Sequence, residues 1–76
     1  REESQAERLK SDIAALEREI ESLKQLRDHV EERLASGAMT KETYDEQIAR
    51  LDERIKGLGE KLKKKKKELR ALEKAD

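Results

Sequence analysis

The stretch LASGAMTKETY, residues 34–44, separates two halves of the sequence that each have helical periodicity. Gly37 can adopt the left-handed conformation that closes the C-terminal end of a helix. Thr40 is a favourable N-cap for a second helix, and Glu42 in its first turn suits the positive end of the helix dipole. The stretch therefore predicts the end of one helix, a turn at residues 37–40 and the start of another helix.

Two further local patterns indicate where the helices begin. Met39 and Tyr44 have the spacing of a hydrophobic staple around Thr40, which orients the chain as it enters the second helix. Ser4 and Glu7 have the spacing of a capping box for the first helix. We expect helices at about 4–36 and 41–75, each roughly 50 Å long.

Both halves carry apolar residues in the 3-4 alternation of heptad positions a and d. Of the eighteen a and d positions, which we call the seam, only Arg27 and Lys65 are polar. Leu26 is the only large aliphatic residue of the two helices outside the seam. A stripe of two apolar residues per heptad is typical of a two-stranded coiled coil. The apolar seam residues are Ala6, Leu9, Ile13, Leu16, Ile20, Leu23, Val30, Leu34, Tyr44, Ile48, Leu51, Ile55, Leu58, Leu62, Leu69 and Leu72.

The two stripes can pair within one chain. If the chain folds back at Met39, residues whose numbers add up to 78 face each other, and every pair joins an a to a d position. Arg27 then falls opposite Leu51. Lys65 falls opposite Ile13, so the two polar seam residues never meet. Each can run its aliphatic part along the seam and place its charge in water.

The same heptad pattern is compatible with two alternative arrangements. One continuous helix in a parallel dimer would place Gly37 and Lys41 in the core, and would set Arg27 and Lys65 each against its own copy, which is destabilising. The sequence therefore predicts an all-α fold, a two-helix antiparallel coiled-coil hairpin. A swapped dimer that makes the same contacts between two chains stays open.

The whole chain, residues 1–76, is expected to form this one hairpin, with Glu2 and Asp76 at the same end. Because the sequence begins with Arg1 rather than Met, we expect it to be part of a larger protein. Charges beside the seam give a mixed pattern under the same pairing: Glu19 with Lys61 and Lys24 with Asp52 are favourable, whereas Asp12 with Glu68, Glu31 with Asp45 and Lys10 with Lys66 are not.

Composition excludes several classes of protein. Half of the residues are charged, the 19 basic and 19 acidic residues cancel, and Tyr44 is the only aromatic residue. The absence of cysteine excludes disulfides and favours an intracellular location. No phosphate-binding loop, activated nucleophile or metal-ligand cluster is recognisable, and His29 is expected to be exposed. We therefore predict no enzyme activity, no cofactor, no metal and no small-molecule substrate.

Five consecutive lysines, Lys63 to Lys67, form the most conspicuous charge run. They wrap around the helix, and residues 56–67 carry a net charge of +6 against −3 for the facing residues 11–22. No aromatic residues are interleaved for stacking on bases. The cluster is either a solvated helix surface or a contact for nucleic acid or an acidic membrane. Its candidate contact residues are Lys61, Lys63, Lys64, Lys66 and Lys67.

Gly57 and Gly59 lie inside the second predicted helix, where each costs about 1 kcal/mol relative to alanine. The seam stays in phase across them, so they do not end the helix. They are either tolerated or form a bare backbone patch on which another chain packs. We hypothesise such a docking patch near Gly57, Gly59 and Glu17.

The turn resembles that of SHOCT (short C-terminal domain) segments, in which a Gly-x-Ile-Thr-x-Glu-Glu-Phe/Tyr run joins two helices. The matching residues lie within residues 30–51 and are Leu34, Gly37, Met39, Thr40, Glu42 and Tyr44. Met39 replaces the usual Ile, Thr43 replaces the second Glu, and the heptad arms are longer than in that family. The resemblance implies a helix–turn–helix with a role in protein contact.

These observations predict a structural function. We expect a coiled-coil arm that spaces, docks or oligomerises attached domains, with a protein partner or self-association. The alternative is an arm that binds an anionic surface, whether nucleic acid or acidic membrane, through its lysine cluster.

Overall fold

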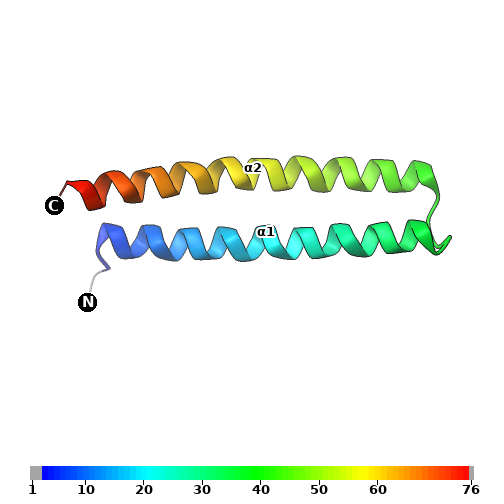
Figure 1. Ribbon diagram of the computed structural model, residues 1–76, viewed down its shortest axis with the longest axis horizontal. Coiled ribbons are helices and arrows are strands. Elements are labelled where there is room, and N and C mark those ends of the chain that lie inside the picture. Colours follow the sequence, from blue (N-terminus) through cyan, green and yellow to red (C-terminus); the bar gives the residue numbers. More distant parts are fainter. Residues whose placement is uncertain (1–2, 76) are drawn as a thin grey trace.

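The computed structural model describes residues 3–75, which form two helices, α1 (Gln5–Ala35) and α2 (Lys41–Lys74). The helices run antiparallel over their whole length, with the turn at one end and the start of α1 and the end of α2 at the other (Figure 1). The molecule measures 55 × 22 × 14 Å. The predicted all-α helical hairpin is confirmed. Glu2 and Asp76, which were expected at the shared end, lie outside the described residues.

The start of α1 is held by the predicted capping box. The Ser4 hydroxyl accepts a hydrogen bond from the Glu7 backbone N–H at 3.1 Å, and the Ser4 backbone N–H donates to the Glu7 carboxylate at 3.3 Å. Together they satisfy two of the four backbone donors that a helix leaves unpaired at its N-terminus.

The end of α1 is a Schellman motif. Gly37 has a φ of 82°, in the left-handed region that glycine adopts without steric conflict. The N–H of Ala38 donates to the Arg33 carbonyl at 2.9 Å, and the N–H of Gly37 donates to the Leu34 carbonyl at 3.1 Å. These two bonds satisfy carbonyls that the last helical turn would leave unpaired, which explains why α1 ends here.

Thr40 begins α2 as predicted. Its hydroxyl accepts a hydrogen bond from the Thr43 backbone N–H at 3.2 Å. Met39 and Tyr44, on either side of this cap, are both half-buried although the surrounding turn is exposed. Their burial is consistent with the predicted staple, which shields the open end of the seam.

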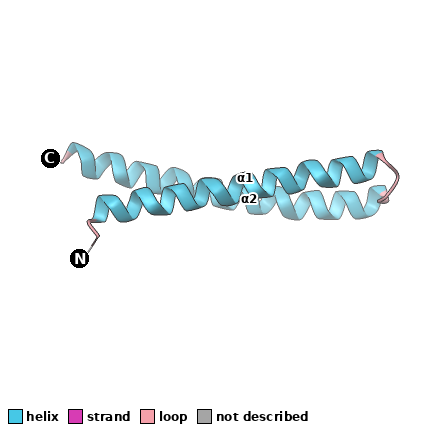
Figure 2. Cartoon of the chain, turned by 90° about the horizontal axis from the view of Figure 1, so that it is seen from below, coloured by secondary structure: helices cyan, strands magenta, loops and turns pink. Residues whose placement is uncertain are grey.

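The predicted seam lies between the helices. All eighteen seam positions are buried or half-buried, including the polar Arg27 and Lys65. Among the described residues only Leu9 and Val30 are buried, with 6 % and 4 % of their surface exposed. Two helices cover each other on one side only, so a seam residue remains open at its flanks. The helices cross at a shallow angle, as two coiled helices do (Figure 2).

Ion pairs between the helices report the register. Within residues 3–75 four pairs join α1 to α2, and their residue numbers add up to 73, 77, 79 and 83, which are centred on the expected 78. They are Glu19–Arg54 at 2.9 Å, Asp12–Lys65 at 3.5 Å, Arg27–Asp52 at 2.8 Å and Glu17–Lys66 at 3.5 Å.

The individual charge pairs expected from the sequence were wrong. Glu19 binds Arg54 instead of Lys61, and Asp52 binds Arg27 instead of Lys24. Long side chains reach diagonally along the hairpin, so the residue directly opposite is not always the partner. Carboxylates expected to face like charges also find cations: Asp12 binds Lys65 on the other helix, whereas Glu31 binds Arg27 and Asp45 binds Lys41 one turn away on the same helix.

Candidate interaction surface

The lysine cluster on α2 is divided by the fold into a paired and an unpaired part. Lys65 is half-buried in the seam, and its ammonium lies 3.5 Å from the Asp12 carboxylate. Lys66 lies 3.5 Å from the carboxylate of Glu17. These two lysines are directed toward α1, so part of their charge is neutralised within the hairpin as expected.

The remaining lysines of the cluster, Lys61, Lys63, Lys64 and Lys67, are exposed, and none of them forms an ion pair with another described residue. They therefore remain available to an anionic partner. The predicted use of this cluster stays a prediction.

Helical spacing extends the unpaired part beyond the run of consecutive lysines into a line along α2. Lys63, Lys67, Arg70 and Lys74 follow one another at i, i+4, i+7 and i+11, all exposed on the side of α2 away from the seam. We call these four residues the basic stripe. They lie along one face because residues three and four apart are neighbours on a helix surface.

The same side of α2 carries opposite charge near the turn. Glu42, Glu46 and Glu53 are exposed at i, i+4 and i+11, with Ala49 at i+7. We call these three glutamates the acidic stripe. None of them forms an ion pair within residues 3–75. The outer side of α2 is therefore negative near the turn and positive near the chain ends.

Gly57 and Gly59 lie between the two stripes, in an unbroken part of α2. Gly57 is exposed and Gly59 is half-buried. A Cβ atom built on either residue would meet no atom within 4 Å outside the adjacent helix backbone. Nothing in the hairpin therefore requires glycine at these positions. Glu17, the third residue of the hypothesised docking patch, is bound by Lys66.

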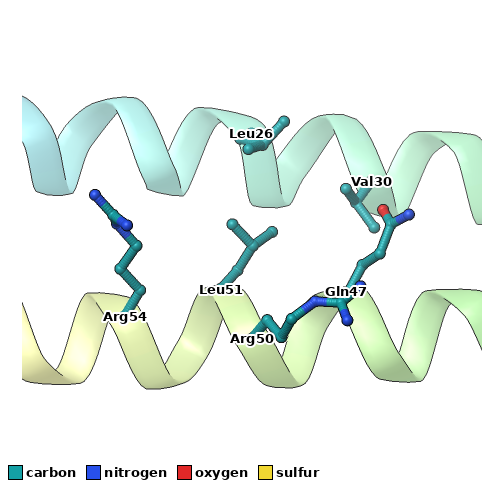
Figure 3. Close-up of a pocket in the computed structure, with 6 residues that line it drawn as sticks. All are labelled: Leu26, Val30, Gln47, Arg50, Leu51 and Arg54. Carbon is teal, nitrogen blue, oxygen red and sulfur yellow. The ribbon is translucent and has the colours of Figure 1, made fainter.

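A shallow apolar groove lies on one flank of the seam (Figure 3). Leu26 is 47 % exposed and is the only large hydrophobic residue of the described chain that is exposed. With Val30 from α1 and Leu51 from α2 it forms an open groove of about 270 Å³, bordered by Gln47, Arg50 and Arg54. Figure 3 shows Leu51 and Arg54 reaching from α2 toward α1. The groove can accept an apolar side chain between these polar borders.

The turn residues predicted as a site, Gly37, Met39, Thr40 and Tyr44, have structural roles in the described helix ends. Residues 3–75 contain no group of three or more side chains that could hold a metal ion. Neither described helix is long and apolar enough to cross a membrane. Comparisons with protein families, curated proteins and solved structures find no match for this chain.

Proposed function

We propose that this chain is a structural arm that spaces, docks or oligomerises domains attached to its ends. The observation that carries the proposal is the antiparallel hairpin itself. The start of α1 and the end of α2 lie together, while the turn lies at the other end of a molecule 55 Å long (Figure 1). An arm of this shape can hold its turn away from whatever is joined to its ends.

The local chemistry supports a stiff arm. Both helices carry a side-chain cap at the start, and α1 is closed by a Schellman motif, so the helix ends on each side of the turn are well defined. The SHOCT-like turn supports the same proposal, because that resemblance implies a role in protein contact.

Distance measurements test the arm directly, because the chain lacks cysteine and can be labelled at introduced cysteines alone. Spin labels at Gln5→Cys and Lys74→Cys should lie within about 25 Å, since packed helices are about 10 Å apart. A continuous helix would separate them by about 100 Å. Labels at Ala38→Cys and Lys74→Cys should give a narrow distribution near about 50 Å.

Either a long distance between positions 5 and 74 or a broad distribution between positions 38 and 74 would contradict the proposed arm. Dilution of doubly labelled chains with unlabelled chains is the control. A distance between positions 5 and 74 that disappears on dilution identifies the swapped dimer.

A second candidate function, contact with an anionic surface, is favoured by the exposed and unpaired Lys63, Lys64 and Lys67. Retention on heparin should fall steeply with salt and disappear when Lys63 to Lys67 are changed to glutamine. The matched control removes five positive charges elsewhere by changing Arg8, Lys10, Arg18, Lys24 and Arg33 to glutamine. Equal losses in both variants, or no retention of the natural chain at low salt, would contradict this function.

A further inference from the structure

The charges on the outer side of α2 are complementary to those on the same side of a second α2 that runs in the opposite direction. Glu42 and Lys74 have numbers that add up to 116. The same sum pairs an acidic with a basic residue at three further positions along this side: Glu46 with Arg70, Glu53 with Lys63, and Lys56 with Glu60. The one remaining pair places Ala49 against Lys67. No pair on this line sets like charges against each other.

The spacing of these residues suits an antiparallel contact between two helices. The ten positions from 42 to 74 alternate in steps of four and three, as the seam residues do, and all ten are exposed. A two-fold rotation about a point near Leu58 brings each residue of one chain opposite its counterpart in a second chain, and every ion pair forms twice. A parallel alignment in register would instead set each charge against its own copy.

We propose that a second copy of this chain docks antiparallel on the outer side of α2, with the acidic stripe of each copy against the basic stripe of the other. This inference rests on the proposed arm function and names its partner. The complementary charges favour this orientation over a parallel alignment in register, which sets each charge against its own copy.

The glycines support the position of the two-fold axis. The sum of 116 applies along the middle of the contact, whereas at its two edges the two-fold axis sets residues of the same heptad position against each other. A centre at Leu58 therefore places Gly57 beside Gly57 of the second copy on one edge, and Gly59 beside Gly59 on the other. Neither glycine has a packing role within the hairpin. Without side chains, the two backbones can approach closely where the helices meet. The second copy thus supplies a reason for two residues that weaken an isolated helix.

The contact is expected to be weak and sensitive to salt, because it consists of exposed ion pairs. Two edge pairs, Arg50 with Lys64 and Asp45 with Glu73, bring like charges together. Asp45 is already bound by Lys41 at 2.6 Å, which reduces its repulsion. We expect a dimer that forms at high protein concentration and low salt and dissociates as salt rises.

Sedimentation equilibrium of the full chain tests the proposal, at about 20 mM and about 500 mM salt. The natural chain should dimerise only at low salt. One variant reverses the acidic stripe by changing Glu42, Glu46 and Glu53 to lysine, and a second reverses the basic stripe by changing Lys63, Lys67, Arg70 and Lys74 to glutamate. Each should be monomeric alone, and an equimolar mixture should form a heterodimer, with far-ultraviolet circular dichroism confirming that both remain helical.

A natural chain that stays monomeric at low salt would overturn the proposal, as would folded variants that fail to associate when mixed. Binding of heparin without self-association would assign the basic stripe to an anionic polymer instead. Either failure leaves the distances measured for the arm unchanged, so it is distinguishable from failure of the arm function.

The glycines provide an independent test. Gly57→Ala together with Gly59→Ala should raise the melting temperature of the hairpin and abolish self-association at low salt. A higher melting temperature with unchanged self-association would show that the backbones do not approach closely at the proposed axis.

Discussion

The Nε atom of Arg27 donates a hydrogen bond to the Asp52 carboxylate of the opposite helix at 2.8 Å, while its Nη1 atom donates to Glu31 on its own helix at 2.7 Å. The hydrogen bond with Asp52 raises the pKa of Arg27 above its already high ordinary value, so the guanidinium stays charged. Lys65, the other polar seam residue, lies beside Asp12. Each polar interruption of the seam thus faces a carboxylate on the other helix.

Replacing Arg27 with leucine should stabilise the hairpin but make its association less specific. Leucine would extend the apolar seam. Asp52 would lose Arg27 as its partner, but its carboxylate is half-exposed to water, so the loss should reduce stability only slightly. Polar seam residues specify register and strand number in coiled coils. We expect a melting temperature several degrees higher and oligomers visible by light scattering. A lower melting temperature would show that the ion pair outweighs apolar burial.

Leucine-to-alanine changes should separate buried from exposed positions. Leu9 is 6 % exposed and Leu26 is 47 % exposed. Leu9→Ala should lower the free energy of unfolding by about 2–4 kcal/mol. Leu26→Ala should lower it by less than about 1 kcal/mol, because less apolar surface is lost from contact. Urea unfolding followed by circular dichroism measures both, and equal effects would contradict the described packing.

Glycine-to-alanine changes should have opposite signs at the turn and within α2. At Gly37, with its φ of 82°, alanine should reduce stability by about 1 kcal/mol because its Cβ conflicts with the left-handed backbone. At Gly57, where a Cβ meets nothing outside the adjacent helix backbone, alanine should add about 0.5–1 kcal/mol of helix stability. Thermal unfolding at high salt, where the chain is expected to be monomeric, compares the two. A loss of stability at Gly57 would contradict the expectation.

The turn should respond to alkaline pH through Lys41. The hydrogen bond that Lys41 donates to Asp45 at 2.6 Å raises the pKa of its ammonium above the ordinary 10.5. Because the pKa is higher in the folded than in the unfolded chain, this contribution is complete below pH 10.5 and is lost as pH rises through the raised value.

The measurement is the melting temperature of the natural chain minus that of Lys41→Gln, between about pH 9 and about pH 12. As pH rises, the melting temperature of the natural chain should fall relative to that of Lys41→Gln. Taking the difference removes the contribution of the other lysines. A difference that is constant across this range would show that the pair does not stabilise the fold.

Most of the fold was predictable because its determinants are local or periodic. The caps at Ser4 and Thr40 and the left-handed Gly37 each act within a few residues of themselves. The predicted helix ends differ from the observed ones by one residue at most. The candidate surface was predictable only in part: the run Lys63 to Lys67 was found, but Arg70 and Lys74 were missed because they continue the line at helical spacing rather than in sequence.

The amino-acid sequence alone determined that two helices form, where they begin and end, and which side of each is apolar. Capping and heptad periodicity decide these features, and both depend on residues that are close together along the chain. Only the tertiary structure decided which carboxylate each cation binds and which lysines remain unpaired. Those outcomes depend on how far flexible side chains reach between the helices. Lys65 and Lys66 reach Asp12 and Glu17 on α1, whereas the charges on the outer side of α2 point away from α1 and stay unpaired within the described hairpin.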